Sequence, residues 1–548
     1  MKFMKKCILL FVLFCCTVGL FAQSGNIINI IPLPVSYTVK TGEFVITPKT
    51  KIVLDSRDEQ MKQAVGVLND LFKTAAGFSL PVTIGKGGNN TLYCLINPKL
   101  DGDEVYKLSV TKNGIRIEAK TPRGIFYATQ TLRQLLPPQI ESQEQVMDVK
   151  WAIPCVEIND RPRYTYRGLH LDVGRHFFDK QDVMRYIDLL AYHKLNTFHW
   201  HLTEDQGWRI EIKKYPKLTE VGAHRTRQVI GKTIDGKRSQ EWVLKPHGGF
   251  YTQDDVREIL DYAAKRFVTV IPEIEMPGHA IAALAAYPQY SCTGGPFYVE
   301  GRWGVINDIF CPREETFAFL EDILTEIVEL FPSEFIHIGG DEAPKVRWKR
   351  CHACQERIKS EGLKDEHELQ SYFITRIGKF LATKGKRIIG WDEILEGGLA
   401  PGATVMAWRG VDAGITTAKQ YHDVIMTPKS HMYLDYYQAN QQTEPYAIGG
   451  YIPIWKVYDY NPTPEELTPK QAKHILGVQG NVWTEYMETF DYVLYMAYPR
   501  AAAVAEIAWT PLERKDYDYF LQRLLNLMRH YDVMGIPYNK TFLNEERK

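Results

Sequence analysis

GLHLDVGRHFFDKQDVMRYIDLLAYHKLNTFHWHL, residues 168–202, is the stretch that decides the fold. A short apolar run over 168–174 ends in polar residues, a helical segment covers 180–193, and a second apolar run covers 197–202. A strand, a helix and a second strand in this order form the unit from which parallel sheets are built. The stretch therefore predicts a parallel sheet covered by helices.

The same alternation continues to the end of the chain. Apolar runs that end in polar residues recur at 168–174, 197–202, 268–276, 335–341, 387–392, 404–408, 423–427 and 475–483. Helical segments lie between several of them, at 180–193, 253–266, 316–331, 368–384 and 413–421. This pattern predicts an α/β fold in which a (β/α)8 TIM barrel occupies residues 158–548. Only about a dozen residues separate the fifth and sixth runs, so we expect the fifth helix to be missing or reduced to a loop.

Residues 24–157 have a different pattern. Short β-rich runs at 51–54, 91–96 and 114–119 alternate with helical stretches at 59–75 and 123–136. The pattern predicts a small α/β (α+β) N-terminal domain that precedes the barrel. Nothing in it resembles catalytic machinery, and we expect a boundary near 158–163.

The first 22 residues predict an export signal. Three lysines precede an apolar run that ends in small residues, which is typical of a secretory signal peptide over 1–22. We expect the mature protein to be periplasmic or secreted. Lipid attachment at Cys15 or Cys16 is the less favoured alternative, because Phe14 stands where such a signal has a small residue. No later run reaches the ~18 apolar residues of a transmembrane segment.

Composition excludes some classes of protein. The 548 residues contain 66 Lys and Arg against 66 Asp and Glu, so the basic excess of a nucleic-acid-binding protein is missing. With 45% hydrophobic residues the chain can bury a large core, which excludes a disordered chain. The 11 Trp and 31 Tyr hint weakly at carbohydrate contact.

Six cysteines remain after the predicted signal, at positions 94, 155, 292, 311, 351 and 354. Cys351 and Cys354 form a lone CHAC motif, and a zinc site would need two further ligands, for which His352 is the only nearby candidate. A local disulfide or two plain thiols is the favoured interpretation. No cofactor motif appears, so we expect no cofactor and no metal.

Polar residues concentrate at the predicted strand ends, where the active site of such a barrel lies. They are Asp172, Arg175, His199, His201, Glu204, Asp205, Glu273, Glu275, His279, Asp341, Glu342, Trp391, Asp392, Glu393, Trp408, Arg409, Tyr433, Asp435, Trp483 and Glu485. Some of these residues have other interpretations. His199 and His201 could make structural hydrogen bonds, or they could bind a metal together with Asp205. Asp172 and Arg175 could form a buried ion pair.

The segment FIHIGGDE, residues 335–342, carries the clearest chemical signal. Two glycines allow the backbone to approach closely, and two adjacent carboxylates follow. Glycoside hydrolysis needs a protonated carboxyl and a group that stabilises the oxocarbenium-like centre, and neighbouring like charges raise one of the two pKa values. Adjacent residues, however, are poorly placed to flank a glycosidic bond, so the second carboxylate is not an obvious nucleophile.

An ordered set of motifs resembles the β-N-acetylhexosaminidases of glycoside hydrolase family 20. The motifs are RGLHLDVGRHF (167–177), HWHLTEDQGWR (199–209), PEIEMPGH (272–279), HIGGDE (337–342), GWDE (390–393), YLD (433–435) and GNVWTE (480–485). The resemblance spans nearly the whole mature chain, including an IPLP opening at 31–34. It implies a glycan substrate with a terminal N-acetylhexosamine.

The resemblance also implies a mechanism in which the substrate's own acetamide carbonyl is the nucleophile. Glu342 is then the general acid and later the general base, and Asp341 holds the acetamide N–H. By the same resemblance, Arg175, Asp435 and Glu485 bind sugar hydroxyls, and Tyr433 donates to the acetamide carbonyl. Trp391, Trp408 and Trp483 form the wall of the sugar pocket. His279 lies near Glu342 and adjusts its proton affinity. Glu204 departs from the pattern, since many relatives have two consecutive aspartates there, and its contact is open.

Three functions are therefore weighed. An exo-acting retaining β-N-acetylhexosaminidase that removes terminal β-linked GlcNAc, and also GalNAc, is preferred. A non-catalytic sugar-binding protein on the same barrel is the alternative, although it would usually have lost Asp341 or Glu342. A two-carboxylate β-glycosidase would need Glu275 or Glu393 as nucleophile and would leave Asp341 without a role.

Overall fold

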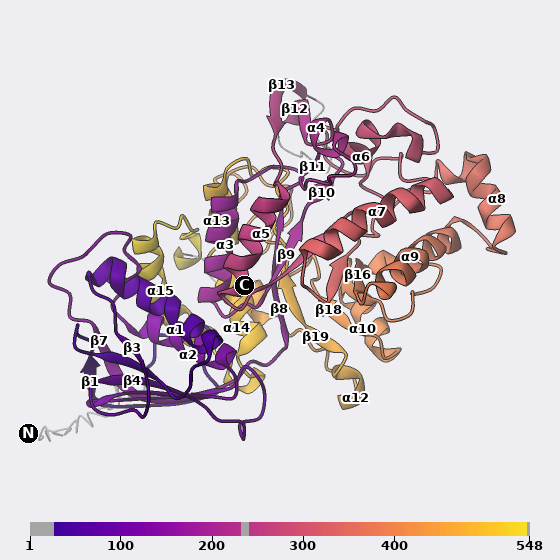
Figure 1. Ribbon diagram of the computed structural model, residues 1–548. Helices are drawn as coiled ribbons and strands as arrows, with labels where there is room; N and C mark the ends of the chain where they lie inside the picture. The colour runs from indigo at the N-terminus through magenta and orange to yellow at the C-terminus, as the bar shows by residue number, and fades with distance from the viewer. Residues whose placement is uncertain (1–26, 232–240, 545–548) are drawn as a thin grey trace, which may run out of the picture.

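The computed structural model describes residues 27–231 and 241–544, which form two domains (Figure 1). The predicted signal peptide lies outside the described residues. The N-terminal domain contains a seven-stranded mixed sheet in the order β1-β7-β5-β6-β4-β2-β3. Its strands are β1 (Ser36–Val45), β2 (Lys51–Leu54), β3 (Val82–Ile84), β4 (Thr91–Ile96), β5 (Tyr106–Thr111), β6 (Gly114–Ala119) and β7 (Ala152–Asp160). Helices α1 (Glu59–Leu71) and α2 (Pro122–Leu135) lie side by side over one face of the sheet (Figure 1).

The connection between the domains is short. Strand β7 pairs with β1 and β5 and ends at Asp160, whereas the barrel begins at Tyr166. The expected division after residue 157 thus falls within β7, since this strand continues the alternating burial of the N-terminal sheet to its last residue.

Eight parallel strands close the barrel, as the sequence predicts, in the order β8-β9-β14-β15-β16-β17-β18-β19. They are β8 (Tyr166–Asp172), β9 (Thr197–His201), β14 (Thr269–Glu273), β15 (Phe335–His337), β16 (Arg387–Trp391), β17 (Thr404–Ala407), β18 (Val424–Met426) and β19 (Ile475–Gly480). Each of the eight predicted runs overlaps one strand and extends beyond its carboxyl end. The residues in these extensions leave the ladder and form the first part of the loop that follows each strand.

Helices surround the barrel. The five predicted helices correspond to α3 (Lys180–Tyr192), α5 (Gln253–Ala264), α7 (Glu314–Leu330), α9 (Glu366–Thr383) and α10 (Val411–Lys419). The connection from β16 to β17 contains only the 3₁₀ turn Asp392–Leu395, which confirms the reduced fifth helix. Helices that the sequence did not delimit are α4 (Lys217–Glu220), α6 (Ile281–Ala286), α8 (His352–Ser360), α11 (Ile454–Asp459), α12 (Pro469–Ala472), α13 (Phe490–Ala497), α14 (Arg500–Trp509) and α15 (Tyr517–Met534).

A long insertion follows β9. It contains the short ribbon of β10 (Thr203–Glu204) and β11 (Gly207–Trp208) and the hairpin of β12 (His224–Ile230) and β13 (Glu241–Gly248). In Figure 1 this hairpin stands at the top of the molecule, away from the N-terminal sheet. The insertion therefore extends the loop face of the barrel.

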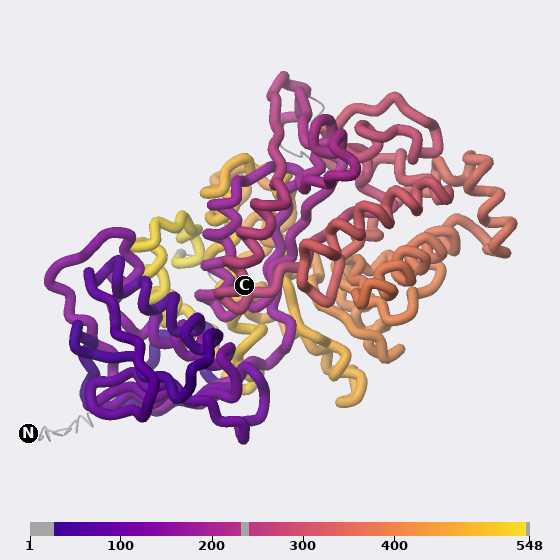
Figure 2. The backbone as a smooth tube through the Cα atoms, in the orientation of Figure 1, coloured from indigo at the N-terminus to yellow at the C-terminus, as the bar shows by residue number. Residues whose placement is uncertain are grey.

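The end of the chain returns to the N-terminal domain. Figure 2 shows the last, yellow segment, which includes α15, beside the indigo N-terminal domain. Tyr519 in α15 donates its hydroxyl proton to the Ile28 carbonyl at 2.9 Å, and Arg523 donates to the Ile30 carbonyl at 2.8 Å. The two domains are thus joined by segments from both ends of the described chain.

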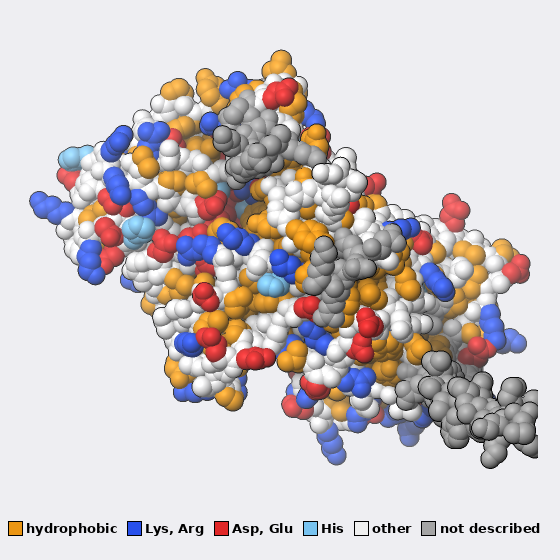
Figure 3. Space-filling view, turned by 180° about the vertical axis from the view of Figure 1, so that it is seen from behind, with side chains coloured by type: hydrophobic (Ala, Val, Ile, Leu, Met, Phe, Trp, Pro, Cys, Tyr) orange, Lys and Arg blue, Asp and Glu red, His pale blue; other side chains and the backbone are white. Residues whose placement is uncertain are grey.

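The surface carries charges of both signs. Acidic and basic side chains are interspersed over the face drawn in Figure 3, in keeping with the balanced composition. Among the described residues, every helix is either too short or too polar to cross a lipid bilayer.

Candidate active site at the carboxyl ends of the barrel strands

The barrel register places polar side chains from four neighbouring strands at one level. Asp172 lies opposite His201, His201 opposite Glu273, and Glu273 opposite His337. All four residues are fully buried. Because the carboxyl ends of all eight strands meet at one face, this layer forms the base on which the loop residues stand.

Glu273 is the centre of this layer. Its carboxylate lies 2.5 Å from His201 Nδ1, 2.8 Å from His337 Nδ1 and 3.0 Å from His199 Nε2, and it accepts the Trp391 indole N–H at 2.7 Å. Burial opposes ionisation, but these histidines hold the pKa of Glu273 well below its usual value. Glu273 therefore fixes the rings above it, a role that the sequence did not assign.

The structure does not bring His199, His201 and Asp205 together as one set of ligands: both histidines contact Glu273, whereas Asp205 has other partners. His201 connects Glu273 to Glu204, whose carboxylate lies 3.2 Å from His201 Nε2. His199 Nδ1 accepts a hydrogen bond from Gln479 at 3.0 Å. Asp205 instead accepts the Ile281 backbone N–H at 2.9 Å and lies 3.2 Å from His279. Both histidines thus make buried hydrogen bonds in the core, as was expected of at least one of them.

Asp341 and Glu342 lie on the segment that follows β15. Gly339 and Gly340 before them have φ values of 67° and 92°. A Cβ on Gly339 would lie 1.7 Å from Glu275 Oε2, so only glycine fits where the backbone crosses this buried carboxylate. Asp341 is nearly buried, with a side chain 12% exposed, whereas the side chain of Glu342 is 38% exposed. The two neighbours therefore face different environments.

His279 connects the acid pair to the β9 insertion. Its Nδ1 lies 2.7 Å from Glu204 and 3.2 Å from Asp205, and its Nε2 lies 3.5 Å from Glu342 and 3.8 Å from Asp341. Burial opposes the charged ring, but the surrounding carboxylates, Glu204 first, raise the pKa of His279 well above its usual value. A charged imidazole therefore stands among the four carboxylates.

The pKa values of the acid pair diverge. Burial raises the pKa of Asp341 to about 7, and the charge of Glu342 contributes while His279 opposes the rise. Burial also acts on Glu342, but its hydrogen bond to His279 and the charges of His279 and Arg175 lower the pKa of this carboxyl. Without substrate, the expected raised pKa therefore belongs to Asp341.

Arg175 is held by three groups. Its guanidinium lies 3.3 Å from Asp172 and 3.3 Å from Glu204, and its Nε donates to Gln206 at 3.1 Å. It also lies over the Trp483 ring, 5.1 Å from the centroid. The buried ion pair with Asp172 is confirmed. Because both oxygens of Glu204 face protein groups and the residue is 1% exposed, Glu204 holds Arg175 and His279 instead of facing the mouth.

Four aromatic side chains gather at neighbouring strand ends. Trp408 stacks on Tyr433 at a centroid distance of 6.1 Å, and Trp483 lies 5.6 Å from Trp391 and 6.3 Å from Tyr433. Trp391 is only 1% exposed and forms the floor of the group, while Trp408 and Trp483 are partly exposed walls. The structure thus brings together the predicted aromatic wall.

Further carboxylates lie around this group. Asp435 and Glu485 are 3% and 8% exposed, and burial, with the charge of Glu485, raises the pKa of Asp435 well above its usual value. Glu393 accepts the Trp408 indole N–H at 2.9 Å, and burial raises its pKa to about 8. Glu275, which is 2% exposed, lies beneath Gly339.

Gln206, which lies in the motif at residues 199–209, has a role that was not predicted from the sequence. Its amide donates to the Arg302 carbonyl at 2.6 Å while its oxygen accepts from Arg175. A groove of about 700 Å³ next to it is lined by the 296–308 loop and the β12–β13 hairpin, including Trp242 and Tyr298. Gln206 therefore connects Arg175 to this outer loop.

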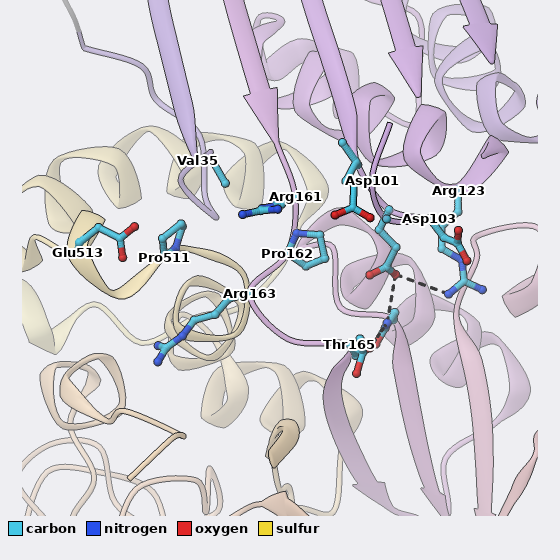
Figure 4. A pocket seen from close by; sticks show the side chains of 14 residues that line it. Val35, Asp101, Asp103, Arg123, Arg161, Pro162, Arg163, Thr165, Pro511 and Glu513 are labelled. Carbon is cyan, nitrogen blue, oxygen red and sulfur yellow. Dashed lines mark hydrogen bonds and ion pairs between the residues drawn. The ribbon is translucent and has the colours of Figure 1, made fainter. Parts of the chain in front are cut away.

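Another cavity, of about 690 Å³, lies at the other end of the barrel (Figure 4). Arg123, Arg161, Arg163 and Asp103 line it between the N-terminal domain and the residues that precede β8 and β9. None of the predicted site residues lines it. The concentration of buried charge at the carboxyl ends makes that end the candidate active site.

Comparisons with known proteins identify the family of the chain. The catalytic-domain model of glycosyl hydrolase family 20 matches residues 164–512, and the model of that family's domain 2 matches residues 27–161. The chain is 48% identical to a beta-hexosaminidase of Porphyromonas gingivalis over 96% of this chain and 67% of that protein. It resembles the solved GH20 beta-N-acetylhexosaminidase from Streptomyces coelicolor, with TM-score 0.80, 31% identity, and coverage of 93% and 97%. It also resembles an exo beta-N-acetylglucosaminidase from Vibrio harveyi in complex with N-acetylglucosamine, with TM-score 0.81, 32% identity, and coverage of 93% and 78%.

Proposed function

This chain belongs to glycosyl hydrolase family 20 and is a β-N-acetylhexosaminidase, and we propose that Glu342 and Asp341 carry out its reaction. The enzyme is exo-acting and retaining, and its substrate is a glycan that ends in β-linked GlcNAc, with GalNAc as a second terminal sugar. The observation that carries the assignment of residues is the adjacent pair itself, with one carboxyl buried and one open to the mouth.

The first step breaks the glycosidic bond without an enzymic nucleophile. The acetamide carbonyl oxygen attacks C1 of the same sugar, the bond from C1 to the leaving oxygen breaks, and Glu342 gives its proton to that oxygen. Asp341 accepts the acetamide N–H and stabilises the positive charge of the oxazoline-type intermediate. Tyr433 donates its hydroxyl to the carbonyl oxygen.

The second step restores the ring substituent. Glu342, now ionised, takes a proton from water, and the water oxygen attacks C1 from the side that the leaving group vacated. The C1 bond to the acetamide oxygen breaks, and the sugar leaves with its configuration retained. One carboxyl therefore serves as acid and then as base.

The proton must be on Glu342 when the bond breaks, whereas the substrate-free pKa values favour Asp341. Binding supplies the difference. The acetamide N–H stabilises ionised Asp341, and the departing group covers Glu342 and desolvates it, which raises its pKa. We infer that substrate binding moves the shared proton from Asp341 to Glu342.

The other groups orient the sugar. Arg175 offers its fork to neighbouring hydroxyls, and Asp435 and Glu485 hold ring hydroxyls on the opposite side. Trp391, Trp408 and Trp483 enclose the apolar faces of the sugar. His279 and Glu204 act through Glu342 and Arg175 and are positioning residues.

A two-carboxylate mechanism has less support. Glu275 is buried beneath Gly339, and Glu393 is hydrogen-bonded to the Trp408 indole. Glu275 is thus covered by backbone, and one oxygen of Glu393 is already engaged by the indole, which suits neither to the role of nucleophile.

The test compares hydrolysis of a chromogenic aryl β-N-acetylglucosaminide with that of the matching β-glucoside, which differs only at carbon 2. We expect turnover of the first alone, because the glucoside lacks the nucleophile. Comparable turnover of both substrates would contradict the substrate-assisted mechanism and favour a carboxylate of the enzyme as the nucleophile. Turnover of neither would favour the sugar-binding alternative.

The protein is also proposed to be exported, either to the periplasm or to the medium. The support is the sequence pattern of residues 1–22. The intact mass of the protein recovered from cell fractions tests this: a mature chain that starts near residue 23 outside the cytoplasm is expected, whereas a lipid-modified Cys15 or Cys16 would establish anchoring instead.

A further inference from the structure

Four cysteines from two separate stretches of the chain converge beside the barrel mouth. The Cys292 and Cys354 sulfurs are 3.6 Å apart, as are those of Cys311 and Cys354, and those of Cys311 and Cys351 are 3.7 Å apart. All four sulfurs lie within 4.8 Å of one another. Three of the residues are buried and Cys292 is partly buried. The CHAC motif thus gains two sulfur partners that the sequence did not indicate.

The spacing of the sulfurs matches a metal site better than disulfides. Four sulfurs at the usual zinc–sulfur distance of about 2.3 Å from one ion have edges of about 3.8 Å. A disulfide bond is far shorter, about 2.05 Å. We propose that Cys292, Cys311, Cys351 and Cys354 bind one zinc ion in a closed, structural site.

The surroundings of the cluster suit such a site. Cys351 is the N-cap of α8, and Cys354 lies in the first turn of this nine-residue helix, where the partial positive charge of the helix N-terminus favours thiolates. Ile309, Trp348 and Leu369 pack around the sulfurs. With four sulfur ligands and an apolar shell, no coordination position remains open for substrate or water, which is typical of a structural ion.

His352, the ligand that the sequence offered, does not take part. Its side chain is 86% exposed and lies 3.3 Å from Glu356. The four ligands therefore come as a Cys-x-x-Cys pair at the start of α8 and two single cysteines from the connection between β14 and α7.

The site joins the segment that carries Asp341 and Glu342 to the loop that supports Arg175 through Gln206. Cys292 and Cys311 stand at the two ends of the 293–310 loop, whose Arg302 carbonyl holds Gln206 and, through it, Arg175. Cys351 closes the segment that begins with Asp341 and Glu342. Two hydrogen bonds support the junction: Trp348 donates to the Phe310 carbonyl at 2.9 Å, and Phe310 donates to the Pro277 carbonyl at 3.0 Å. The ion would hold the acid loop against the loop that lines the outer groove.

The alternative to a zinc site is that the four cysteines form two disulfide bonds, because an exported chain enters an oxidising compartment. The test therefore uses the full chain, expressed with residues 1–26 intact and purified without chelator. Zinc and iron per chain are measured by elemental mass spectrometry, and the oxidation state of each cysteine by peptide mapping without reduction. We expect one zinc ion per chain and four reduced cysteines. Two disulfides, an iron-only chain, or a metal-free chain with four reactive thiols would each overturn the proposal.

Variants locate the ion. Cys311→Ser and Cys354→Ser should lose most of the zinc, whereas Cys155→Ser, a buried cysteine outside the cluster, should retain it. If the cluster variants do not fold, cobalt exchange into the unmodified chain decides the question. Tetrahedral sulfur ligation gives intense thiolate-to-cobalt charge-transfer bands, and their absence from a cobalt-loaded chain would exclude the site.

A stability measurement separates this proposal from the catalytic one. A mercurial reagent that displaces zinc from thiolates should release the ion. The melting temperature of the chain should fall in proportion to the amount of zinc released. Cys155→Ser should release the same amount of zinc. An unchanged melting temperature after complete release would show that the ion has no structural role, whatever the activity on aryl glycosides.

Discussion

At the scale of single residues, the chemistry depends on how two adjacent carboxyls differ. Asp341 turns toward the buried layer and His279, while Glu342 is the more exposed of the two. His279 stands within 4 Å of both and is itself held by Glu204 and Asp205. One charged ring therefore influences where a single proton resides in the pair.

Glu342→Gln removes the proton donor and retains the shape of the side chain. We expect hydrolysis of an oligosaccharide to fall by about 10²–10⁴-fold, because its leaving oxygen needs a proton. An aryl glycoside with a nitrophenol leaving group should lose less in its bond-breaking step. Steady-state kinetics on both substrates check this. Equal losses on both would contradict the role of Glu342 as the acid.

The proton shared by the pair predicts an alkaline limb in the pH profile. The pKa of Asp341 is raised to about 7, so the pair holds one proton below this pH and loses it above. Because bond cleavage needs that proton, kcat/KM should fall as the pH rises through about 7. A profile that stays flat to alkaline pH would show that the proton comes from elsewhere.

Asp341→Asn removes the charge that stabilises the intermediate. We expect kcat to fall by about 10²–10³-fold while KM changes little, since the interaction is strongest in the transition state. Kinetics of the variant against the unmodified enzyme measure the two constants separately. A rise in KM alone would reduce Asp341 to a binding residue.

At the scale of elements, the end of β15 shows why a glycine pair precedes the acids. Gly339 turns the backbone at φ 67° directly over Glu275, and its carbonyl accepts a hydrogen bond from the Trp391 backbone N–H at 2.9 Å. The turn directs Asp341 and Glu342 into the mouth. Any side chain at Gly339 would have to displace a buried carboxylate.

Gly339→Ala tests this close approach. The new methyl group meets Glu275, so we expect a loss of about 1–3 kcal/mol of stability together with a marked loss of activity. Gly385→Ala is the matched control, because Gly385 also has positive φ, 73°, but no atom within 4 Å of an added Cβ. Its variant should lose about 1 kcal/mol and keep full activity. Similar melting curves and activities for the two variants would show that the contact with Glu275 has no consequence.

At the scale of the whole molecule, buried charges join the two domains. Lys194, in the connection between α3 and β9, lies 3.1 Å from Asp160 at the end of β7, and both side chains are completely buried. Asp160 also accepts hydrogen bonds from Tyr106 at 2.5 Å and from the Trp509 indole at 2.9 Å. Nearby, the buried Arg167 pairs with Glu104 of the N-terminal domain at 2.8 Å. Carboxylates of the N-terminal domain therefore neutralise the buried cations Lys194 and Arg167 at the end of the barrel opposite the active site.

Asp160→Ala leaves the Lys194 ammonium buried without its partner. We expect the free energy of unfolding to fall by about 3–5 kcal/mol, measured by urea denaturation. The control is Glu157→Ala on the same strand, whose ion pair with Lys40 is exposed and contributes about 1 kcal/mol or less. Equal effects of the two substitutions would contradict a supporting role for this interface.

Much of the barrel was predictable because its strands are almost entirely buried. A strand that is covered on both sides appears as a continuous apolar run, and each of the eight runs ends where polar loop residues begin. The location of the candidate site was also predictable, because the carboxyl ends of all strands converge at one face of a closed barrel. The exact extent of the N-terminal domain was not, because β7 lies far in sequence from its partners β1 and β5.

Some roles depended on contacts between distant segments. Glu273 and Gln206 are ordinary polar residues in the sequence, and only register and side-chain contacts reveal that they hold Trp391 and Arg175. The convergence of Cys292 and Cys311 on Cys351 and Cys354 is invisible to any local spacing rule, because two separate loops must first fold against each other.

The sequence by itself determined the fold and the order of the strands, because these follow from local hydrophobic periodicity. It also indicated the chemical class of the site, because an ordered set of motifs that includes Asp341 and Glu342 resembles a known family of glycosidases. The tertiary structure alone decided which carboxyl is buried, which carries the raised pKa, and which cysteines meet. These properties depend on burial, on charge at a distance and on packing between loops, and such interactions arise only after the chain has brought distant residues together.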